Sequence, residues 1–390
     1  MERLFEHYRN KLAFTKTAFV RSLEQNIDWK SSLIGIRGPR GVGKSNLMLQ
    51  HIKKAFKEDY SRALYASLDD LYFADNSLSH LAEQFIRRGG THLFLDEVHK
   101  YPKWDQAVKS LHDNFPGLSI VYAGSSLLEK QAHTYDMQGL SFREYLAFNT
   151  NREYPIFSLE DILTRTEEIS AQLASGIKPF KYFDNYLRMG YYPFFVLGEK
   201  NYLSRMNETI NMILDIELPI LRNMETSSIP KIRKLLAVIS KASPCAPNVA
   251  SLASHIGVAR QTLLSYLKHL EEGNLIVLLY KGARGTGSLV KPDRLYLENS
   301  NLMYDLMDHE VAPSDALETF VLNQLKKDHD IKLTASGDFL VDDRHTFRMC
   351  SGNRKQKRAK DEGNSYIIAD DIEIGSGRLI PVWLLGFLYY

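Results

Sequence analysis

One eight-residue segment, Gly38–Ser45, constrains the fold of this chain more than any other feature. It reads GPRGVGKS and satisfies the pattern G-x-x-x-x-G-K-[S/T], with the apolar segment Ser32–Arg37 before it and a helical pattern from Asn46 onward. Consecutive backbone N–H groups in such a loop surround a phosphate group, and Gly41 and Gly43 permit the positive φ angles that this requires. The sequence therefore predicts a polyphosphate-binding loop between a strand and a helix.

The residues of this loop are predicted to have different roles. Those expected to line the phosphates are Gly38, Pro39, Arg40, Gly41, Val42, Gly43, Lys44, Ser45 and Asn46. Lys44 is predicted to reach the β- and γ-phosphates, and the Ser45 hydroxyl to ligate Mg²⁺. The helix N-terminus contributes a favourable dipole. The side chain of Arg40 is expected to point outward, and no role of its own is assigned to it.

Two adjacent acids, Asp96 and Glu97, follow the apolar segment His92–Leu95. The carboxyl ends of parallel strands meet at one edge of a sheet, so both carboxylates should lie beside the phosphate loop. Asp96 is predicted to hold the Mg²⁺ shell, and Glu97 to act as the general base that activates a water molecule. The other interpretation, a strand end with two solvated acids, is much less consistent with the phosphate loop nearby.

Short apolar segments alternate with helical patterns over the first third of the chain, which is typical of an α/β domain with a parallel sheet. The predicted strands are Ser32–Arg37, Ala63–Leu68, His92–Leu95 and Leu118–Ala123, and the helices include Leu47–Phe56 and Trp104–Leu111. The last strand is expected between the first and third, where Ser125 or Ser126 would contact the γ-phosphate as a sensor, and Ser125 is the one assigned to the catalytic set with Lys44 and Glu97. Ser126 fits equally well as the N-cap of the next helix.

The remaining sequence predicts three further parts after a nucleotide-binding domain at 1–150. Residues 151–225 have a helical and aromatic pattern and are predicted to form a lid or linker. In 226–298, helical patterns, a turn at Gly257 and two strand-like segments predict a winged helix-turn-helix. Residues 299–390 mix helical and strand patterns and predict a small α+β domain.

Several segments together resemble a family of bacterial and archaeal ATPases of the AAA superfamily. They are GPRGVGKS, LFLDEVHKYPKWDQAVKSLHD, YAGSS, MQGLSFREYL, GDFLV and IADDIE…IPVWLLGFLY, and the resemblance extends over nearly the whole chain. Members combine a P-loop AAA-type domain with a winged helix and a C-terminal restriction-endonuclease-like domain. The resemblance implies that ATP and Mg²⁺ bind at Gly38–Ser45, Asp96 and Glu97, and that ATP is hydrolysed.

The chain lacks the segment with paired arginines that members of this family usually carry before the QGLSFREYL motif. An arginine near the γ-phosphate stabilises the transition state, so slow hydrolysis is expected. Arg143 is a candidate substitute, although an exposed helix arginine is the interpretation favoured here. Rings are usual among AAA proteins, but without a clear arginine acting in trans a monomer or a dimer remains open.

The C-terminal part departs from the nuclease pattern. Such an active site needs two carboxylates for the metal and a lysine for the water. Asp338 could be the first carboxylate, but Arg348 stands where the second is expected and the lysine position falls near Gly352. A cation in place of an acid repels Mg²⁺, so this domain is predicted to be inactive.

The net charge of +2 does not by itself demand a nucleic-acid or lipid partner. DNA contact is a local prediction for the winged helix, through Arg260, Gln261 and Lys268, with Lys281 and Arg284 on the wing, and for the basic segment 344–360. A packing role for the winged helix, or a solvated loop at 344–360, is the alternative.

Two cysteines exclude a disulfide framework and a four-ligand zinc site, which fits a reducing compartment. The chain begins without a secretion signal, and the longest apolar stretch, Leu379–Tyr390, is too short to cross a bilayer. We therefore expect a cytoplasmic protein without membrane contact.

Two functional hypotheses follow from these features. The first is a Mg²⁺-dependent ATPase whose nucleotide state changes the conformation of the winged-helix domain. The second is a nucleotide-loaded switch, or a DNA- or protein-binding scaffold, with negligible turnover. The Asp96–Glu97 pair favours the first, and the absent arginine segment favours the second.

Overall fold

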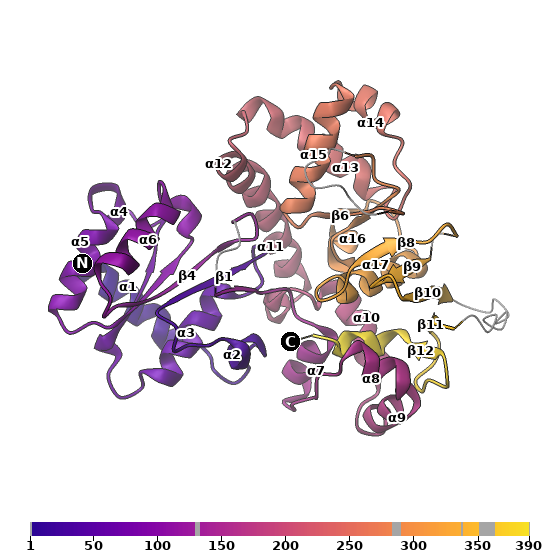
Figure 1. Cartoon of the computed structure of the whole chain (residues 1–390), viewed down its shortest axis with the longest axis horizontal. Coiled ribbons are helices and arrows are strands. Elements are labelled where there is room, and N and C mark those ends of the chain that lie inside the picture. The colour runs from indigo at the N-terminus through magenta and orange to yellow at the C-terminus, as the bar shows by residue number, and fades with distance from the viewer. Residues whose placement is uncertain (1, 129–132, 283–289, 337, 351–362, 390) are drawn as a thin grey trace. The chain divides into compact units, whose positions relative to one another are not determined.

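The computed structural model describes residues 2–128, 133–282, 290–336, 338–350 and 363–389 (Figure 1). The chain divides into two compact units. The first contains Met1–Gly139 together with Asp215–Met224, and the second contains Leu140–Leu214 and Glu225–Tyr390. The first continuous stretch of the first unit ends at Gly139, and the expected domain boundary at residue 150 stays a prediction. A short segment of the expected lid, 215–224, belongs to the first unit.

The first unit is built on a five-stranded sheet with the order β2-β3-β4-β1-β5, and every neighbouring pair in it is parallel. The strands are β1 (Leu33–Gly38), β2 (Ala63–Ser67), β3 (His92–Asp96), β4 (Ser119–Ser125) and β5 (Thr134–Asp136). The main helices are α1 (Glu2–Phe14), α3 (Lys44–Ala55), α5 (Leu78–Arg87) and α6 (Trp104–Asn114), and the short ones are α2 (Leu23–Asn26), η1 (Tyr60–Arg62), α4 (Tyr72–Asp75) and η2 (Val98–Lys100).

The predicted α/β class and all four predicted strands of this sheet are confirmed. Successive residues of β3 and β4 are buried, because side chains on both faces of a parallel sheet are covered. As expected, β4 lies between β3 and β1, with Ile120 opposite Leu33 and Leu93. The edge strand β5 was not predicted, since its three partly buried residues, Thr-Tyr-Asp, lack the apolar pattern of the other strands.

A short segment after residue 214 returns to the first unit. It comprises the last residues of a π-helical turn, η4 (Ile213–Glu217), and α12 (Leu218–Arg222). Helix α12 packs against η2, and Arg222 Nη2 donates a hydrogen bond to the backbone oxygen of Leu127 over 3.3 Å. This placement brings a distant piece of the sequence to the end of the sheet where β3 and β4 terminate.

The second unit begins with a helical portion. Its helices are α7 (Phe142–Thr150), α8 (Leu159–Thr164), α9 (Thr166–Gly176), α10 (Pro179–Met189), η3 (Pro193–Leu197) and α11 (Glu199–Met212). Then come η5 (Thr226–Ser228), α13 (Ile229–Ser240), α14 (Val249–Ile256) and α15 (Arg260–Glu272), followed by the antiparallel strands β6 (Ile276–Leu279) and β7 (Arg294–Leu297). The helices and strands expected for 226–298 are therefore present, and their assignment as a winged helix-turn-helix remains a prediction.

The C-terminal portion contains α16 (Ser300–Leu306), α17 (Pro313–Leu325) and a second five-stranded sheet, in the order β12-β11-β10-β9-β8. These strands are β8 (Ile331–Leu333), β9 (Phe339–Val341), β10 (His345–Cys350), β11 (Ser365–Ala369) and β12 (Leu379–Pro381), and η6 (Val382–Phe387) follows. Parallel and antiparallel pairs coexist in this sheet. The predicted small α+β part is confirmed.

One continuous hydrophobic core joins the helical and C-terminal portions of the second unit. Phe142 of α7 is fully buried and packs edge-on against Phe183 of α10 and Phe387 of η6, with ring centroids 5.1 and 6.3 Å away. Such edge-to-face contacts favour a fixed arrangement of the three elements. The sequence pattern assigns the helical and the C-terminal portions to separate parts of the chain. In the structure, both portions pack around the same aromatic side chains.

In the described ranges, no helix has both the length and the hydrophobicity that a membrane crossing requires.

Candidate functional site

The loop Gly38–Ser45 joins the end of β1 to the start of α3, as the sequence predicts. Gly41 and Gly43 have φ angles of 85° and 102°, a backbone region that residues with a Cβ atom rarely adopt. Helix α3 begins at Lys44, directly after Gly43, so the orphan N–H groups of its first turn lie in the loop. This backbone geometry suits an anion, because the first N–H groups of a helix have no partner within that helix and lie at its positive end.

Lys44 carries a buried positive charge at this loop. Its side chain is 8% exposed, and Nζ donates hydrogen bonds to the backbone oxygens of Gly38 and Pro39 over 2.7 and 2.8 Å. Burial lowers the pKa of Lys44, while the carboxylates of Glu97, Glu217 and Asp96 oppose that shift. Among the described residues, no carboxylate lies within ion-pair distance of Nζ. A phosphate group would supply the missing counter-charge, so the residues present fit a polyphosphate.

Asp96 is held at the end of β3 by a tyrosine on the neighbouring strand. Its carboxylate is buried, with Oδ2 accepting a hydrogen bond from the Tyr65 hydroxyl over 2.5 Å and Oδ1 accepting one from the Glu97 N–H over 2.9 Å. Burial, and then the charge of Asp96, raises the pKa of Tyr65, while the nearby Ser45 side chain has the opposite effect. Tyr65 therefore remains a neutral donor that orients Asp96.

Two side-chain oxygens suited to a metal ion, those of Ser45 at the start of α3 and Asp96 at the end of β3, thus lie in the region of the Tyr65 hydroxyl. Mg²⁺ is usually bound by one or two protein oxygens together with substrate phosphates and water, so this donor set fits the ion. In the part of the chain that the structure describes, no group of three or more His, Cys, Asp or Glu side chains could hold a metal by itself. A magnesium site here would therefore depend on phosphate oxygens as well.

Glu97 faces an arginine from the phosphate loop. Arg40 Nη1 lies 3.3 Å from Glu97 Oε2 and 3.1 Å from Glu217 Oε1. The expectation that Arg40 points outward is therefore wrong, because two acids from distant segments attract its guanidinium. Burial opposes the charged form of Arg40, but the two carboxylates outweigh burial and raise its pKa. The proposed base thus shares one cation with a second acid.

Ser125 ends β4 next to the same cluster, in the place where the sequence predicts a sensor. Its hydroxyl donates a hydrogen bond to Glu217 Oε2 over 2.5 Å, and both side chains are buried. Glu217 follows Ser125 by 92 residues and lies in a helical segment whose pattern is unremarkable in sequence. Sequence reasoning missed Glu217 for that reason, since only the tertiary structure brings it to the sheet edge.

His99 is a further residue that sequence reasoning missed. The residue is 4% exposed, and its Nε2 lies 3.4 Å from Glu97 Oε2. Burial lowers the pKa of His99, so the imidazole is neutral near pH 7. Within the described ranges neither ring nitrogen has a hydrogen-bond partner of good geometry. A neutral, buried ring beside Glu97 limits the positions that this carboxylate can take.

Arg143 does not have the exposure expected of it. The side chain is buried, and its guanidinium donates to the backbone oxygens of Tyr154 and Tyr389 over 3.3 and 3.4 Å. These hydrogen bonds connect α7 to the residues that follow it and to the last residues of the second unit. The favoured interpretation of Arg143 as an exposed helix residue is therefore wrong, because buried carbonyl oxygens require a donor.

The predicted DNA-contacting residues have mixed surroundings. Arg260 and Gln261 are exposed at the start of α15, whereas Lys268 is half-buried with Nζ 3.8 Å from Glu272 Oε1. Lys281 is exposed, and Arg284 lies outside the described residues. The basic segment 344–360 is described only as far as Cys350, and within that stretch Arg344 pairs with Glu160 over 3.8 Å. DNA contact remains a prediction at both places.

The C-terminal acid expected to begin a nuclease site is paired with a cation. Arg348 Nε lies 3.2 Å from Asp338 Oδ2, so the guanidinium takes up the carboxylate that a metal would need. Gly352, the expected lysine position, lies outside the described residues. We predict that the purified protein leaves linear and supercoiled DNA intact with Mg²⁺ or Mn²⁺, as gel electrophoresis would show. Cleavage that disappears in Asp338→Asn would contradict this prediction.

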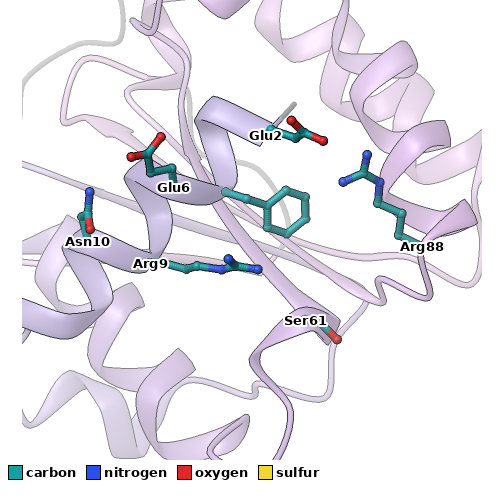
Figure 2. Close-up of a pocket in the computed structure, with 7 residues that line it drawn as sticks. Glu2, Glu6, Arg9, Asn10, Ser61 and Arg88 are labelled. Carbon is teal, nitrogen blue, oxygen red and sulfur yellow. The ribbon is translucent and has the colours of Figure 1, made fainter.

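A separate cavity of about 610 Å³ lies beside α1 in the first unit (Figure 2). Residues that line it include Glu2, Glu6, Arg9 and Arg88, together with the ring of Phe5. The Arg88 guanidinium lies 6.0 Å from the centre of that ring. The two glutamates and the two arginines of this lining carry no net charge together. The charge of the lining therefore favours neither an anionic nor a cationic ligand.

Residues 30–146 match the family model described as an AAA domain. The matched range includes the loop Gly38–Ser45, the Asp96–Glu97 pair and Ser125, and it identifies an AAA-type domain at residues 30–146, most of which lie in the first unit. A search of curated proteins gives no match.

Similar solved structures include Caenorhabditis elegans PCH-2, at 15% identity and a TM-score of 0.22 over 37% of this chain and 45% of that one. Drosophila ORC bound to DNA matches at 14% identity and a TM-score of 0.25, over 74% of this chain and 88% of that one. The Saccharomyces cerevisiae Hsp104–ADP complex matches at 16% identity and a TM-score of 0.26, over 68% and 38%. The chain thus spans less than half the length of the PCH-2 and Hsp104 chains that it matches.

Proposed function

Because residues 30–146 carry an AAA-type domain, we propose that the first unit binds ATP with Mg²⁺ and hydrolyses it. The observation that supports this most strongly is the buried Lys44 ammonium, whose hydrogen-bond partners among the described residues are loop carbonyls at the base of a helix. Placing a charge there is unfavourable unless an anion completes the site. The adjacent acids then distinguish a hydrolytic site from one that only binds phosphate.

Each residue has a role in the proposed reaction. Lys44 binds the β- and γ-phosphates, while Ser45 and Asp96 would hold Mg²⁺, which neutralises charge on the phosphate oxygens when bound. Glu97 accepts a proton from the attacking water. The Ser125 hydroxyl donates a hydrogen bond to the terminal phosphate, and the neutral Tyr65 keeps Asp96 oriented. Arg40 is the cation of this unit nearest to Glu97 in the described residues.

A nucleotide-loaded switch with negligible turnover is the second candidate function. The ion pair between Arg40 and Glu97 favours it, because a carboxylate oxygen that already accepts a hydrogen bond from a guanidinium is less available to an attacking water molecule. In both functions the nucleotide would change the conformation of the predicted winged-helix part. The segment 215–224 supports such a link, since the residues before and after it belong to the second unit.

Removal of the metal tests the proposed function directly. With excess Mg²⁺ and ATP we expect steady release of inorganic phosphate, and with EDTA a fall of at least about 100-fold, because the acids would then repel the phosphates. A coupled phosphate assay measures both rates, and calorimetry measures ATP binding in the same samples. Tight ATP binding without detectable phosphate release would favour the switch. Failure to bind ATP and ADP would contradict both functions.

A further inference from the structure

Glu217 occupies a position that neither the phosphate-loop motif nor the Asp96–Glu97 pair accounts for. It is 3% exposed and uses both carboxylate oxygens, Oε1 towards Arg40 at 3.1 Å and Oε2 towards the Ser125 hydroxyl at 2.5 Å. Its two partners are the loop cation nearest Glu97 and the predicted γ-phosphate sensor. Glu217 is therefore connected to the two groups that a terminal phosphate would approach.

The charges around Glu217 make this arrangement sensitive to a further anion. Three acids, Asp96, Glu97 and Glu217, influence the buried Lys44, and Arg40 is shared by two of them. A guanidinium binds the oxygens of a phosphate more strongly than one carboxylate oxygen, since it can donate two parallel hydrogen bonds. A γ-phosphate near Arg40 would also repel the Glu217 carboxylate at short range in a site of low dielectric constant.

The path of the chain determines which residues a displacement of Glu217 would affect. Glu217 lies on Asp215–Met224, a segment of the first unit that comes from beyond Gly139, and Leu214 and Glu225 on either side of it belong to the second unit. In that segment, α12 packs on η2, which directly follows Glu97. The covalent connection from the cluster to the second unit is therefore short in both directions.

We propose that Glu217 is a positioning residue that reports the terminal phosphate of a bound nucleotide to the second unit. A triphosphate takes over Arg40 and Ser125, Glu217 loses both partners, and segment 215–224 loosens from the sheet edge. A diphosphate leaves the Arg40–Glu217–Ser125 contacts in place. This inference rests on the proposed function, because it requires that the phosphate loop binds nucleotides.

Hydrogen exchange on the full-length wild-type protein tests the inference without any substitution. Samples contain Mg²⁺ and either no nucleotide, ADP or a non-hydrolysable ATP analogue, and peptides covering 215–224 are compared. We expect faster exchange with the triphosphate analogue than in the other two samples, because the contacts of Glu217 are lost. Equal exchange in the ADP and analogue samples, with both nucleotides bound, would overturn the inference.

Glu217→Gln gives a second and independent measurement. The amide keeps the size of the side chain but removes the charge that competes for Arg40, so the triphosphate analogue should bind about tenfold more tightly. The affinity for ADP should change by less than about threefold on the same argument. Asp215→Asn is the matched control, since it removes the same charge from an exposed position on the same segment.

The two hypotheses fail in distinguishable ways. If the wild type binds neither ADP nor the analogue in calorimetry, the proposed function fails and the inference with it. If both nucleotides bind but Glu217→Gln alters their affinities equally or not at all, only the inference fails. An equal gain in Asp215→Asn would likewise contradict it, because the effect would then come from net charge and not from the contact with Arg40.

Discussion

Replacing Glu97 with glutamine is expected to reduce phosphate release by roughly 10²- to 10⁴-fold, the usual contribution of a general base. Glutamine has nearly the same shape as glutamate but cannot accept a proton from water. ATP binding should be retained or strengthened, because one negative charge is removed beside Arg40 and the phosphate loop. Single-turnover phosphate release and calorimetric titration with ATP measure the two quantities separately.

Glu83→Gln is the matched control for this substitution. Glu83 is an exposed acid on α5 in the same unit, and it takes no part in the cluster around the loop. We expect wild-type rates from it. If Glu97→Gln retained full turnover, Glu97 would not be the base and another group would have to activate the water. If it lost ATP binding as well, Glu97 would have a structural role through its contact with Arg40.

Lys44→Ala should weaken ATP binding by about 100-fold or more, because the charge-assisted hydrogen bonds of a buried ammonium to phosphate are among the strongest in proteins. Phosphate release should fall with binding, since in the proposed function the same ammonium would contact the reacting phosphate. Calorimetry with ATP and ADP gives the two dissociation constants, and the loss should be greater for ATP if Lys44 reaches the γ-phosphate.

The stability of the Lys44→Ala variant provides an additional check. Lys44 is buried and its pKa is lowered, so the charged form is disfavoured in the nucleotide-free protein. We therefore expect the variant without nucleotide to be no less stable in thermal unfolding than the wild type. Lys57→Ala removes an exposed lysine just beyond the same helix and should alter neither binding nor stability. An unchanged ATP affinity in Lys44→Ala would contradict the proposed site.

The sequence pattern predicts the parts of the fold that local residue types specify, and it misses the parts that depend on contacts between distant segments. The strands of the first unit are predictable because each is a contiguous apolar segment, and burial on both faces of a parallel sheet requires that pattern. Strand β5 escapes prediction because pairing with β1 stabilises it more than its own residue types do. The shared core of the second unit depends on Phe142, Phe183 and Phe387 meeting in space, and their separation along the chain carries no local signal.

The candidate site divides in the same way. The sequence alone predicted the placement of the loop Gly38–Ser45 between a strand and a helix, and of Asp96 and Glu97 at the end of the strand β3, because a short local motif specifies each of them. The direction of Arg40, the buried state of Arg143 and the presence of Glu217 were decided only by the tertiary structure. Arg40 and Glu217 are 177 residues apart, and such a contact exists only once an entire second segment has folded against the first. Local patterns specify what a backbone can bind, whereas the charges that surround it depend on which distant segments pack there.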